Sequence, residues 1–441
     1  TRNSKEERHE ELPPRNVFLP TLYWEVTNGM RRMIRGFCAL LSLCMMALLG
    51  TVLYMEDSIP DRYLLVPGQE LQFHTLLPVY ARSTVGSHAP EVYSSAGNSY
   101  QLELTTLAGV KVKNVQINVV DRPMVVPGGE PFGIKMFTDG VMVVGLSDIP
   151  TDTGRLNPAK EAGITTGDIV LSVDGEKATG NRQVAQLIAD SNGRAMTFRI
   201  RRGEEVLTVE VEPVRSQSDG QYHAGIWVRD SSAGIGTITW YDPASGLFTG
   251  LGHPVCDVDT GELMPLNRGE AVEVSVTGVS KGQSGTPGEL KGCFLEQHIL
   301  GPLTANTDTG IYGQLSGGSQ VLDTAPVPVA TKQEVHTGAA TILTTLDGST
   351  PKEYDVEIEQ VDLSGDSATK NLVVRITDPE LIEAAGGIVQ GMSGSPILQD
   401  GMIVGSVTHV FVNDPLRGFG IFAENILMGA AASLYSTGDA A

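Results

Sequence analysis

The residues best suited to chemistry lie in a short stretch of small side chains, Gly391-Met392-Ser393-Gly394-Ser395-Pro396. Glycines permit backbone angles and close approaches that a Cβ atom forbids. A serine hydroxyl displayed on such a turn can be a nucleophile, and it can also be an ordinary turn residue. A nucleophilic serine needs a base within hydrogen-bond reach, a group that orients the base, and donors for the oxyanion. The other residues of the chain decide between the two interpretations.

The best candidate for the base is His253, which lies in the stretch Phe248–Asp257 between Gly252 and Pro254. A glycine on one side and a proline on the other make a rigid, open turn that can present an imidazole. A hydrogen-bonded loop histidine is the alternative. His409 lies on a predicted strand after the serine and is the reserve candidate.

The oxyanion donors are predicted from the strand pair that comes after the serine. Residues 396–399 and 402–405 are apolar runs joined by Asp400-Gly401, a strong β-hairpin signal. In chymotrypsin-type enzymes the nucleophile loop precedes such a strand pair. The backbone N–H groups of Gly391 and Ser393 would then bind the oxyanion.

The elements that must hold these residues are mainly β-strands. The 441 residues predict two or three domains, and the 51 glycines favour turn-rich β structure. Residues 216–441 contain many short apolar runs separated by turn signals, which predicts a β-barrel or sandwich. One helix is predicted at residues 378–385, starting at Asp378-Pro379 and ending at Gly386-Gly387.

Residues 126–215 resemble a PDZ domain of the bacterial protease type through the stretch NPAKEAGITTGDIVLSVDGE, residues 157–176. A helix is predicted at residues 181–190 and a hairpin at residues 198–211. PDZ domains bind a peptide carboxylate on a loop of backbone N–H groups, and the peptide adds a strand to the sheet edge. The carboxylate loop is predicted at Pro131-Phe132-Gly133-Ile134. A spacer role, or a groove filled by the chain's own segment, is the alternative.

A membrane anchor is predicted at residues 36–55, which are 20 residues without a charge. Arg31, Arg32 and Arg35 precede this run, so the positive-inside rule places the N-terminus in the cytoplasm and the part after Asp57 outside it. A cleaved signal peptide is the alternative. The anchor unit is taken as residues 30–57.

The remaining segments carry no chemistry. Residues 1–29 are interpreted as a disordered tail or an over-extended start, and residues 58–125 as a linker with a small β region. The formal net charge of −21 argues against nucleic-acid binding, which needs clustered Lys and Arg. Cys256 and Cys293 are the two cysteines outside the apolar run, and they are either bridged or buried thiols.

The motifs GLGHPVCDVDTG and GMSGSP, behind a PDZ domain and one membrane segment, resemble the stage IV sporulation protein B family of serine peptidases. The resemblance covers the chain from about residue 30 and implies a chymotrypsin-like β-barrel peptidase domain at residues 216–441. It assigns the nucleophile to Ser393, the base to His253 and the acid to Asp378. On sequence alone Asp378 is also a helix N-cap. Alternative acids are Asp257, Asp259, Asp355, Asp362 and Asp366.

The resemblance further implies a role in sporulation signalling. Such a peptidase is exported across the inner forespore membrane and cuts a membrane regulator of sigma factor K processing. It also cuts itself, for which the stretch Glu56–Leu77 is the predicted site. The implied partners are a protein substrate, a PDZ ligand and the membrane, with no metal or cofactor. A general PDZ-bearing quality-control protease and a catalytically inactive PDZ scaffold are the alternatives.

Overall fold

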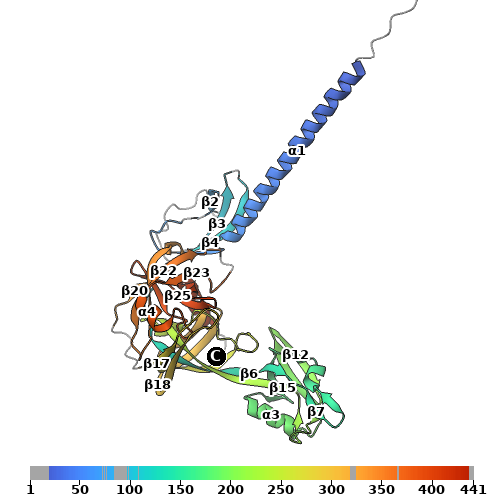
Figure 1. The fold of residues 1–441 in the computed structure, drawn as a ribbon, viewed down its shortest axis with the longest axis vertical. Coiled ribbons are helices and arrows are strands. Elements are labelled where there is room, and N and C mark those ends of the chain that lie inside the picture. Colours follow the sequence, from blue (N-terminus) through green and yellow to red (C-terminus); the bar gives the residue numbers. More distant parts are fainter. Residues whose placement is uncertain are drawn as a thin grey trace, which may run out of the picture.

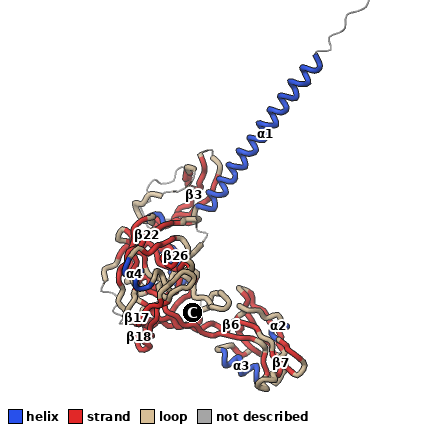
Figure 2. Tube along the Cα trace, viewed as in Figure 1, coloured by secondary structure: helices blue, strands red, loops and turns tan. Residues whose placement is uncertain are grey.

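The structure is a computed structural model that describes residues 19–71, 73, 75, 77–83, 97, 99–107, 109–317, 324–364 and 367–436. The fold is mainly β, as the sequence predicts (Figure 2). A long helix leads into a small β module, two β-barrels follow, and the PDZ domain lies at the end of a two-stranded ribbon (Figure 1). The candidate acid Asp366 lies outside the described residues.

Helix α1 spans Leu19–Ser58 and contains the predicted anchor. Its segment Met33–Ser58 has a mean hydropathy of 2.2 over an 18-residue window, which by length and composition suits a membrane span or a signal sequence. Most of this segment is exposed, but Val52 and Met55 are buried, and Met55 belongs to the core of the β module. The apolar helix therefore continues into folded structure.

The β module forms a four-stranded sheet in the order β1-β4-β3-β2. Strand β1 lies parallel to β4, and the other pairs are antiparallel. Alternate side chains of β3 and β4 are buried, which is the period expected of a strand with one covered face. The strands are β1 Arg62–Leu65, β2 Val79–Ser83, β3 Ser99–Thr106 and β4 Lys111–Val119.

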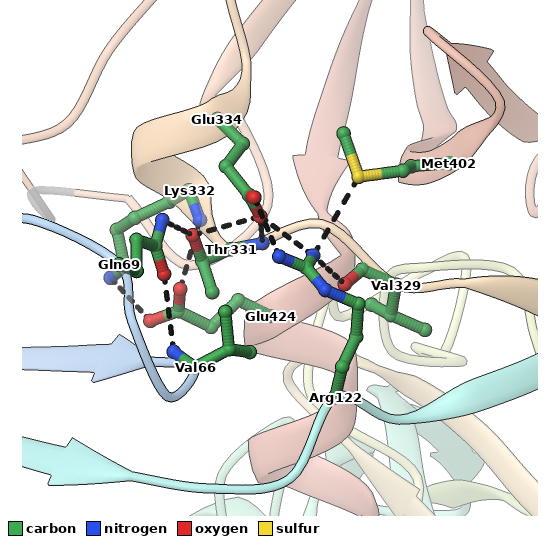
Figure 3. A network of polar contacts seen from close by, with 9 residues as sticks. All are labelled: Val66, Gln69, Arg122, Val329, Thr331, Lys332, Glu334, Met402 and Glu424. Carbon is green, nitrogen blue, oxygen red and sulfur yellow. Dashed lines mark hydrogen bonds and ion pairs between the residues drawn. The ribbon is translucent and has the colours of Figure 1, made fainter. Parts of the chain in front are cut away.

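Polar contacts attach this module to the barrels (Figure 3). The Gln69 amide donates to Thr331 Oγ1 at 2.9 Å. Next to it, the backbone N–H of Lys332 donates to the buried carboxylate of Glu424 at 2.9 Å, and the Lys332 ammonium lies 3.5 Å from the same group. Arg122, which follows the module, pairs with Glu334 at 2.7 Å. Gln69 therefore joins the module to the segment next to the second barrel, and Arg122 holds the chain that leaves the module.

The first barrel is closed by the ring of pairings β6-β17-β18-β19-β16-β15, with β15 returning to β6. Its core includes Phe132, Ile134, Tyr241 and Phe248. Strand β5 pairs with β15 and with β20 outside the ring. The strands are β5 Met124–Pro127, β6 Pro131–Leu146, β15 Ile226–Tyr241, β16 Leu247–Gly250, β17 Leu266–Ser280, β18 Glu289–Thr307, β19 Gly310–Gln314 and β20 Val327–Pro328.

The second barrel is closed in the order β21-β22-β23-β26-β25-β24. The predicted hairpin is confirmed: β24 and β25 are joined at Asp400 and Gly401, whose φ values of 52° and 77° suit this tight turn. The predicted helix is α4. The elements are η1 Lys332–Glu334, β21 Gly338–Thr344, β22 Lys352–Val361, β23 Leu372–Ile376, α4 Pro379–Ala385, β24 Pro396–Gln399, β25 Met402–Phe411, β26 Asp414–Phe422 and α5 Ala423–Ser436.

The PDZ domain is inserted into the first barrel. Strands β6 and β15 pair along almost their whole length, and the PDZ elements occupy the place of the hairpin turn between them (Figure 1). The PDZ core is formed by residues from Val141 to Ala224. Its elements are β7 Ile149–Thr151, β8 Gly154–Leu156, α2 Pro158–Glu161, β9 Ile169–Val173, β10 Glu176–Lys177, α3 Asn181–Asp190, β11 Met196–Arg202, β12 Glu205–Val211, β13 Val214–Arg215 and β14 Tyr222–His223. The PDZ core therefore includes residues beyond 215, whereas the start of β6, within the predicted range 126–215, lies in the core of the first barrel.

The predicted carboxylate loop is wrong. Pro131, Phe132, Gly133 and Ile134 form the start of β6, where they are buried and pair with β15 on one side and β17 on the other. A strand with neighbours on both edges has its backbone groups engaged in the sheet, so it cannot offer N–H groups to a peptide. These residues belong to the core of the first barrel.

Candidate active site

The nucleophile loop needs its two glycines. Gly391 and Gly394 have φ values of 99° and 98°, a region that residues with a Cβ rarely adopt. A Cβ on Gly394 would lie 2.0 Å from the carbonyl oxygen of Thr237, and one on Gly391 would lie 3.0 Å from Leu290. The loop therefore packs directly on β15 and β18 of the first barrel while it leads into β24 of the second. Ser393 lies where the barrels meet.

Thr237 of β15 holds both ends of this loop. Its backbone N–H donates to the Ser393 carbonyl at 2.9 Å. Its hydroxyl donates to the Gly391 carbonyl at 2.7 Å. Thr237 is almost completely buried, so these bonds are shielded from water. Sequence reasoning missed Thr237, because nothing local marks it: its role depends on a contact 154 residues away.

The predicted oxyanion donors, Gly391 and Ser393, lie in peptide groups whose carbonyls are hydrogen-bonded. Leu290 N–H donates to the Gln390 carbonyl at 2.8 Å, and Ser395 N–H donates to the Met392 carbonyl at 2.9 Å. In a trans peptide the N–H points opposite to the C=O. The N–H groups of Gly391 and Ser393 therefore point away from these contacts, and no hydrogen bond to another described residue is recorded for either. Both N–H groups are therefore free to donate to an oxyanion, as the prediction requires.

His253 follows β16 in a turn that also requires glycine. Gly252 has a φ of 66°, and a Cβ there would lie 2.6 Å from Ser406 Oγ. The His253 Nδ1 atom lies 2.8 Å from the carbonyl oxygen of Pro254. A carbonyl only accepts, so the neutral ring carries its proton on Nδ1 and has a lone pair on Nε2. Burial lowers the His253 pKa below its ordinary value of 6.5.

Ser393 and His253 both lie against the same part of β25. The Ser393 hydroxyl donates to the Thr408 carbonyl at 2.7 Å, and the His253 ring lies 4.8 Å from that of His409. No Ser393–His253 hydrogen bond is recorded in this state, and rotation of the serine side chain would have to form it. Catalytic hydrogen bonds are often incomplete before substrate binds. Burial, and then the charge of His253, lower the pKa of His409 to about 4, so His409 is neutral.

The structure records no hydrogen bond or ion pair between Asp378 and His253. One carboxylate oxygen of Asp378 accepts the N–H groups of Glu380 and Leu381 at 2.8 and 3.1 Å, which is an N-cap of α4. The other oxygen lies 3.4 Å from the N–H of Asp355. No contact with His253 is recorded. The sequence-level interpretation of Asp378 as a cap is therefore confirmed, and the structure assigns no contact that supports a triad acid.

Three of the alternative acids have partners elsewhere. Asp257 and Asp259 both pair with Arg229, and Asp362 accepts the N–H of Ser364. Among the described residues no carboxylate contacts His253, and none appears among the causes of its pKa shift. The described residues contain no group of three or more His, Cys, Asp or Glu side chains that could hold a metal ion. Cys256 and Cys293 are not bridged.

The PDZ groove lies on the far part of β15. A cavity of about 280 Å³ is lined by Val184, Ala185 and Ile188 of α3 on one side and by residues 223–228 on the other. Gly225 has a φ of 81°, so the chain turns there before β15 begins. A groove between a helix and a strand edge is where PDZ domains bind peptides. The sequence signal that was missed is His223-Ala224-Gly225-Ile226, a short turn before an apolar strand.

Comparison with known proteins agrees with this geometry. Residues 220–427 match the family described as SpoIVB peptidase S55, and residues 134–212 match the PDZ domain family. Residues 220–427 belong to the SpoIVB peptidase family, S55. The chain therefore contains a PDZ domain and a domain of a serine peptidase family, and the match to the PDZ family begins beyond Gly133.

Other similarities are more limited. A Clostridium perfringens protein named as a zinc metalloprotease is 37% identical over 70 residues, which are 16% of this chain and 21% of that protein. The chain thus spans about a fifth of the length of this curated relative. The active form of the Rv3671c protease from M. tuberculosis matches with a TM-score of 0.26 at 16% identity, over 45% of this chain and 74% of the other. Its inactive form matches with a TM-score of 0.25 at 15% identity, over 45% and 83%.

Proposed function

We propose that the chain is a membrane-anchored serine endopeptidase in which Ser393 and His253 perform the chemistry. Ser393 Oγ attacks the scissile carbonyl, and its proton passes to Nε2 of His253. His253 then gives this proton to the leaving amine, and water releases the acyl group by the reverse exchange. The N–H groups of Gly391 and Ser393 stabilise the oxyanion. The observation that carries this proposal is the pair of peptide groups fixed by Leu290 and Ser395, which leaves the N–H groups of Gly391 and Ser393 without a recorded partner among the described residues.

In this proposal the Pro254 carbonyl takes the place of the triad acid. It fixes the proton on Nδ1 of His253, which is the tautomer that general-base catalysis needs. A neutral carbonyl stabilises the imidazolium less than a carboxylate does. The proposal therefore predicts a catalyst with a serine–histidine pair and no catalytic aspartate.

The biological role that we propose is inferred from the match to the SpoIVB peptidase family. We propose that the enzyme is exported across the inner forespore membrane, with its N-terminus in the cytoplasm. There it cuts the extracytoplasmic part of a membrane regulator of sigma factor K processing. The family match and the apolar helix α1 support this role. A substrate that is itself anchored in a membrane suits an enzyme whose β module is joined to its own anchor helix.

Self-cleavage is proposed for the later part of the predicted stretch. Ile59, Tyr63, Leu65 and Val66 are buried in the β module, so a protease would have to unfold it to cut there. Pro67, Gly68 and Leu77 are exposed. The proposed site is therefore within residues 67–77, and sequencing the N-terminus of the released enzyme tests it. A mature N-terminus within residues 59–66, or only intact chain in active cells, would contradict it.

Labelling with a fluorophosphonate tests the nucleophile. The full chain in detergent micelles should be modified at Ser393, as located by mass spectrometry. Ser393→Ala and His253→Ala should each lower the labelling rate by at least about 10³-fold. Ser395→Ala is the matched control, because the Ser395 hydroxyl is buried and has no recorded partner among the described residues. Absence of labelling in the wild type would favour the inactive scaffold. Broad digestion of unfolded casein would favour the quality-control protease.

A further inference from the structure

A groove beside the oxyanion donors is not used by the chemistry described above. It encloses about 380 Å³ and is lined by residues 233–235 of β15, by Glu289, Leu290 and Phe294 of β18, and by Gln390 and Gly391. Gly391 supplies one oxyanion N–H, and Leu290 N–H orients the peptide group that carries it. A side chain in this groove would therefore belong to a residue very close to the scissile carbonyl.

One edge of β15 is open along this groove. Strand β15 pairs with β6 from Ile226 to Thr237, whereas its pairing with β16 begins only at Ile238. The N–H and C=O of Thr237 point away from β6, toward Ser393 and Leu251. Backbone groups alternate in direction along a strand. Those of Ile235 and Ala233 therefore point to the same side, and no partner for them is recorded among the described residues.

The groove is apolar inside and polar at its rim. Ile235 and Phe294 are half-buried and Leu290 is buried, while Ala233, Gly234 and Gly391 leave room between them. Glu289 and Gln390 are exposed at the border. An extended chain next to an open strand edge gains backbone hydrogen bonds, and alternate side chains enter pockets. This lining suits a large apolar or aromatic side chain with a cationic or neutral residue next to it.

The other side of Ser393 is bordered by β25, where the Thr408 carbonyl accepts the serine hydroxyl. Two strand edges from different barrels thus flank the nucleophile. We propose that the β15 groove binds the substrate segment that follows the scissile bond, as an added strand with a large apolar side chain at its first or second residue. The β25 edge then takes the acyl half. This inference rests on the proposed peptidase function and names the substrate feature that its site selects.

The test uses internally quenched peptides that differ only in the two residues after the scissile bond, with the full chain in detergent micelles. Wild type should cleave Phe or Leu peptides with kcat/KM at least about 10-fold above Gly or Asp peptides, since a filled apolar pocket contributes roughly 10- to 200-fold. Phe294→Ala should remove most of this preference for Phe or Leu over Gly. Leu295→Ala is the matched control, because Leu295 is exposed on the same strand and does not line the groove.

A charge change at the rim provides a second variant that does not disturb the core. The wild type should prefer peptides with Lys over peptides with Asp next to the apolar residue. Glu289→Lys should reverse this preference. Selectivity confined to residues before the scissile bond, or an unchanged preference in both variants, would overturn the inference. Each peptide is also tested for protection of Ser393 from fluorophosphonate. If fluorophosphonate labels Ser393 and the apolar peptides do not slow this labelling, the proposed groove is wrong but the peptidase function stands. If Ser393 is not labelled at all, the peptidase function itself is contradicted.

Discussion

Asp378 provides the sharpest test of how His253 is held. If Asp378 were a triad acid, Asp378→Asn would leave the geometry intact and lower kcat by about 10⁴-fold, through the wrong histidine tautomer. In the structure the carboxylate instead accepts two backbone N–H groups at the start of α4. Asn caps helices about as well as Asp. We therefore expect Asp378→Asn to keep kcat/KM within about 3-fold, because the Pro254 carbonyl still fixes the tautomer.

The matched variant is Asp378→Ala, which removes the cap as well as the charge. Losing an N-cap costs about 0.5–2 kcal/mol of folding free energy. For a catalytic unit of this size about 1 kcal/mol lowers Tm by roughly 2–4 °C. Both variants are compared by peptide cleavage and by thermal unfolding. A 10³-fold or larger loss of kcat in a normally folded Asp378→Asn enzyme would refute the cap assignment and restore the triad.

Three further results are expected. Thr237→Val should lower kcat by about 10-fold with little change in KM, because it leaves the Gly391 carbonyl without its donor. Thr237→Ser keeps the hydroxyl and should retain activity. Equal activity in the two variants would show that the hydrogen bond from Thr237 to Gly391 is unimportant. The acid limb of the pH profile of kcat/KM should have its midpoint below pH 6.5, because His253 must be neutral to act as a base and burial lowers its pKa. A carboxylate paired with His253 would raise this pKa and move the midpoint to higher pH. Glu424→Ala should lower the free energy of unfolding by about 3–5 kcal/mol in chemical denaturation, because it leaves the Lys332 ammonium buried without its partner. Glu380→Ala, at the exposed pair with Lys352, should not have this effect. Similar losses in the two variants would show that burial does not decide what an ion pair contributes to stability.

Local patterns in the sequence predicted local features well. The Asp-Gly turn, the helix that starts after Asp378, and the PDZ helix at residues 181–190 all depend on neighbours along the chain. The glycines around Ser393 and His253 could also be interpreted from the sequence, because a positive φ or a close approach of the backbone requires glycine at that position. These are the parts of the site for which the sequence was sufficient.

The errors came from long-range pairing. Residues 131–134 were predicted to be the carboxylate loop of the PDZ domain, yet they begin the long strand β6, whose first half is buried in a barrel. Its partner strand begins at Ile226, so no local signal assigns the first half to the peptidase. Asp378 shows the same limit: its sequence context fits both a cap and a triad acid. Only the three-dimensional position of His253 separates the two.

Strand β15 connects the features that matter most for function. Its first residues, 226–228, border the PDZ groove, residues 233–235 border the groove beside Gly391, and Thr237 holds the nucleophile loop. At about 3.3 Å per residue, the two grooves are separated by roughly 23 Å along one strand. A ligand that adds to the PDZ edge therefore binds the strand that also shapes the catalytic loop. Because β15 is paired with β6 across this whole distance, the ribbon restricts how far the PDZ domain can move without disturbing Thr237.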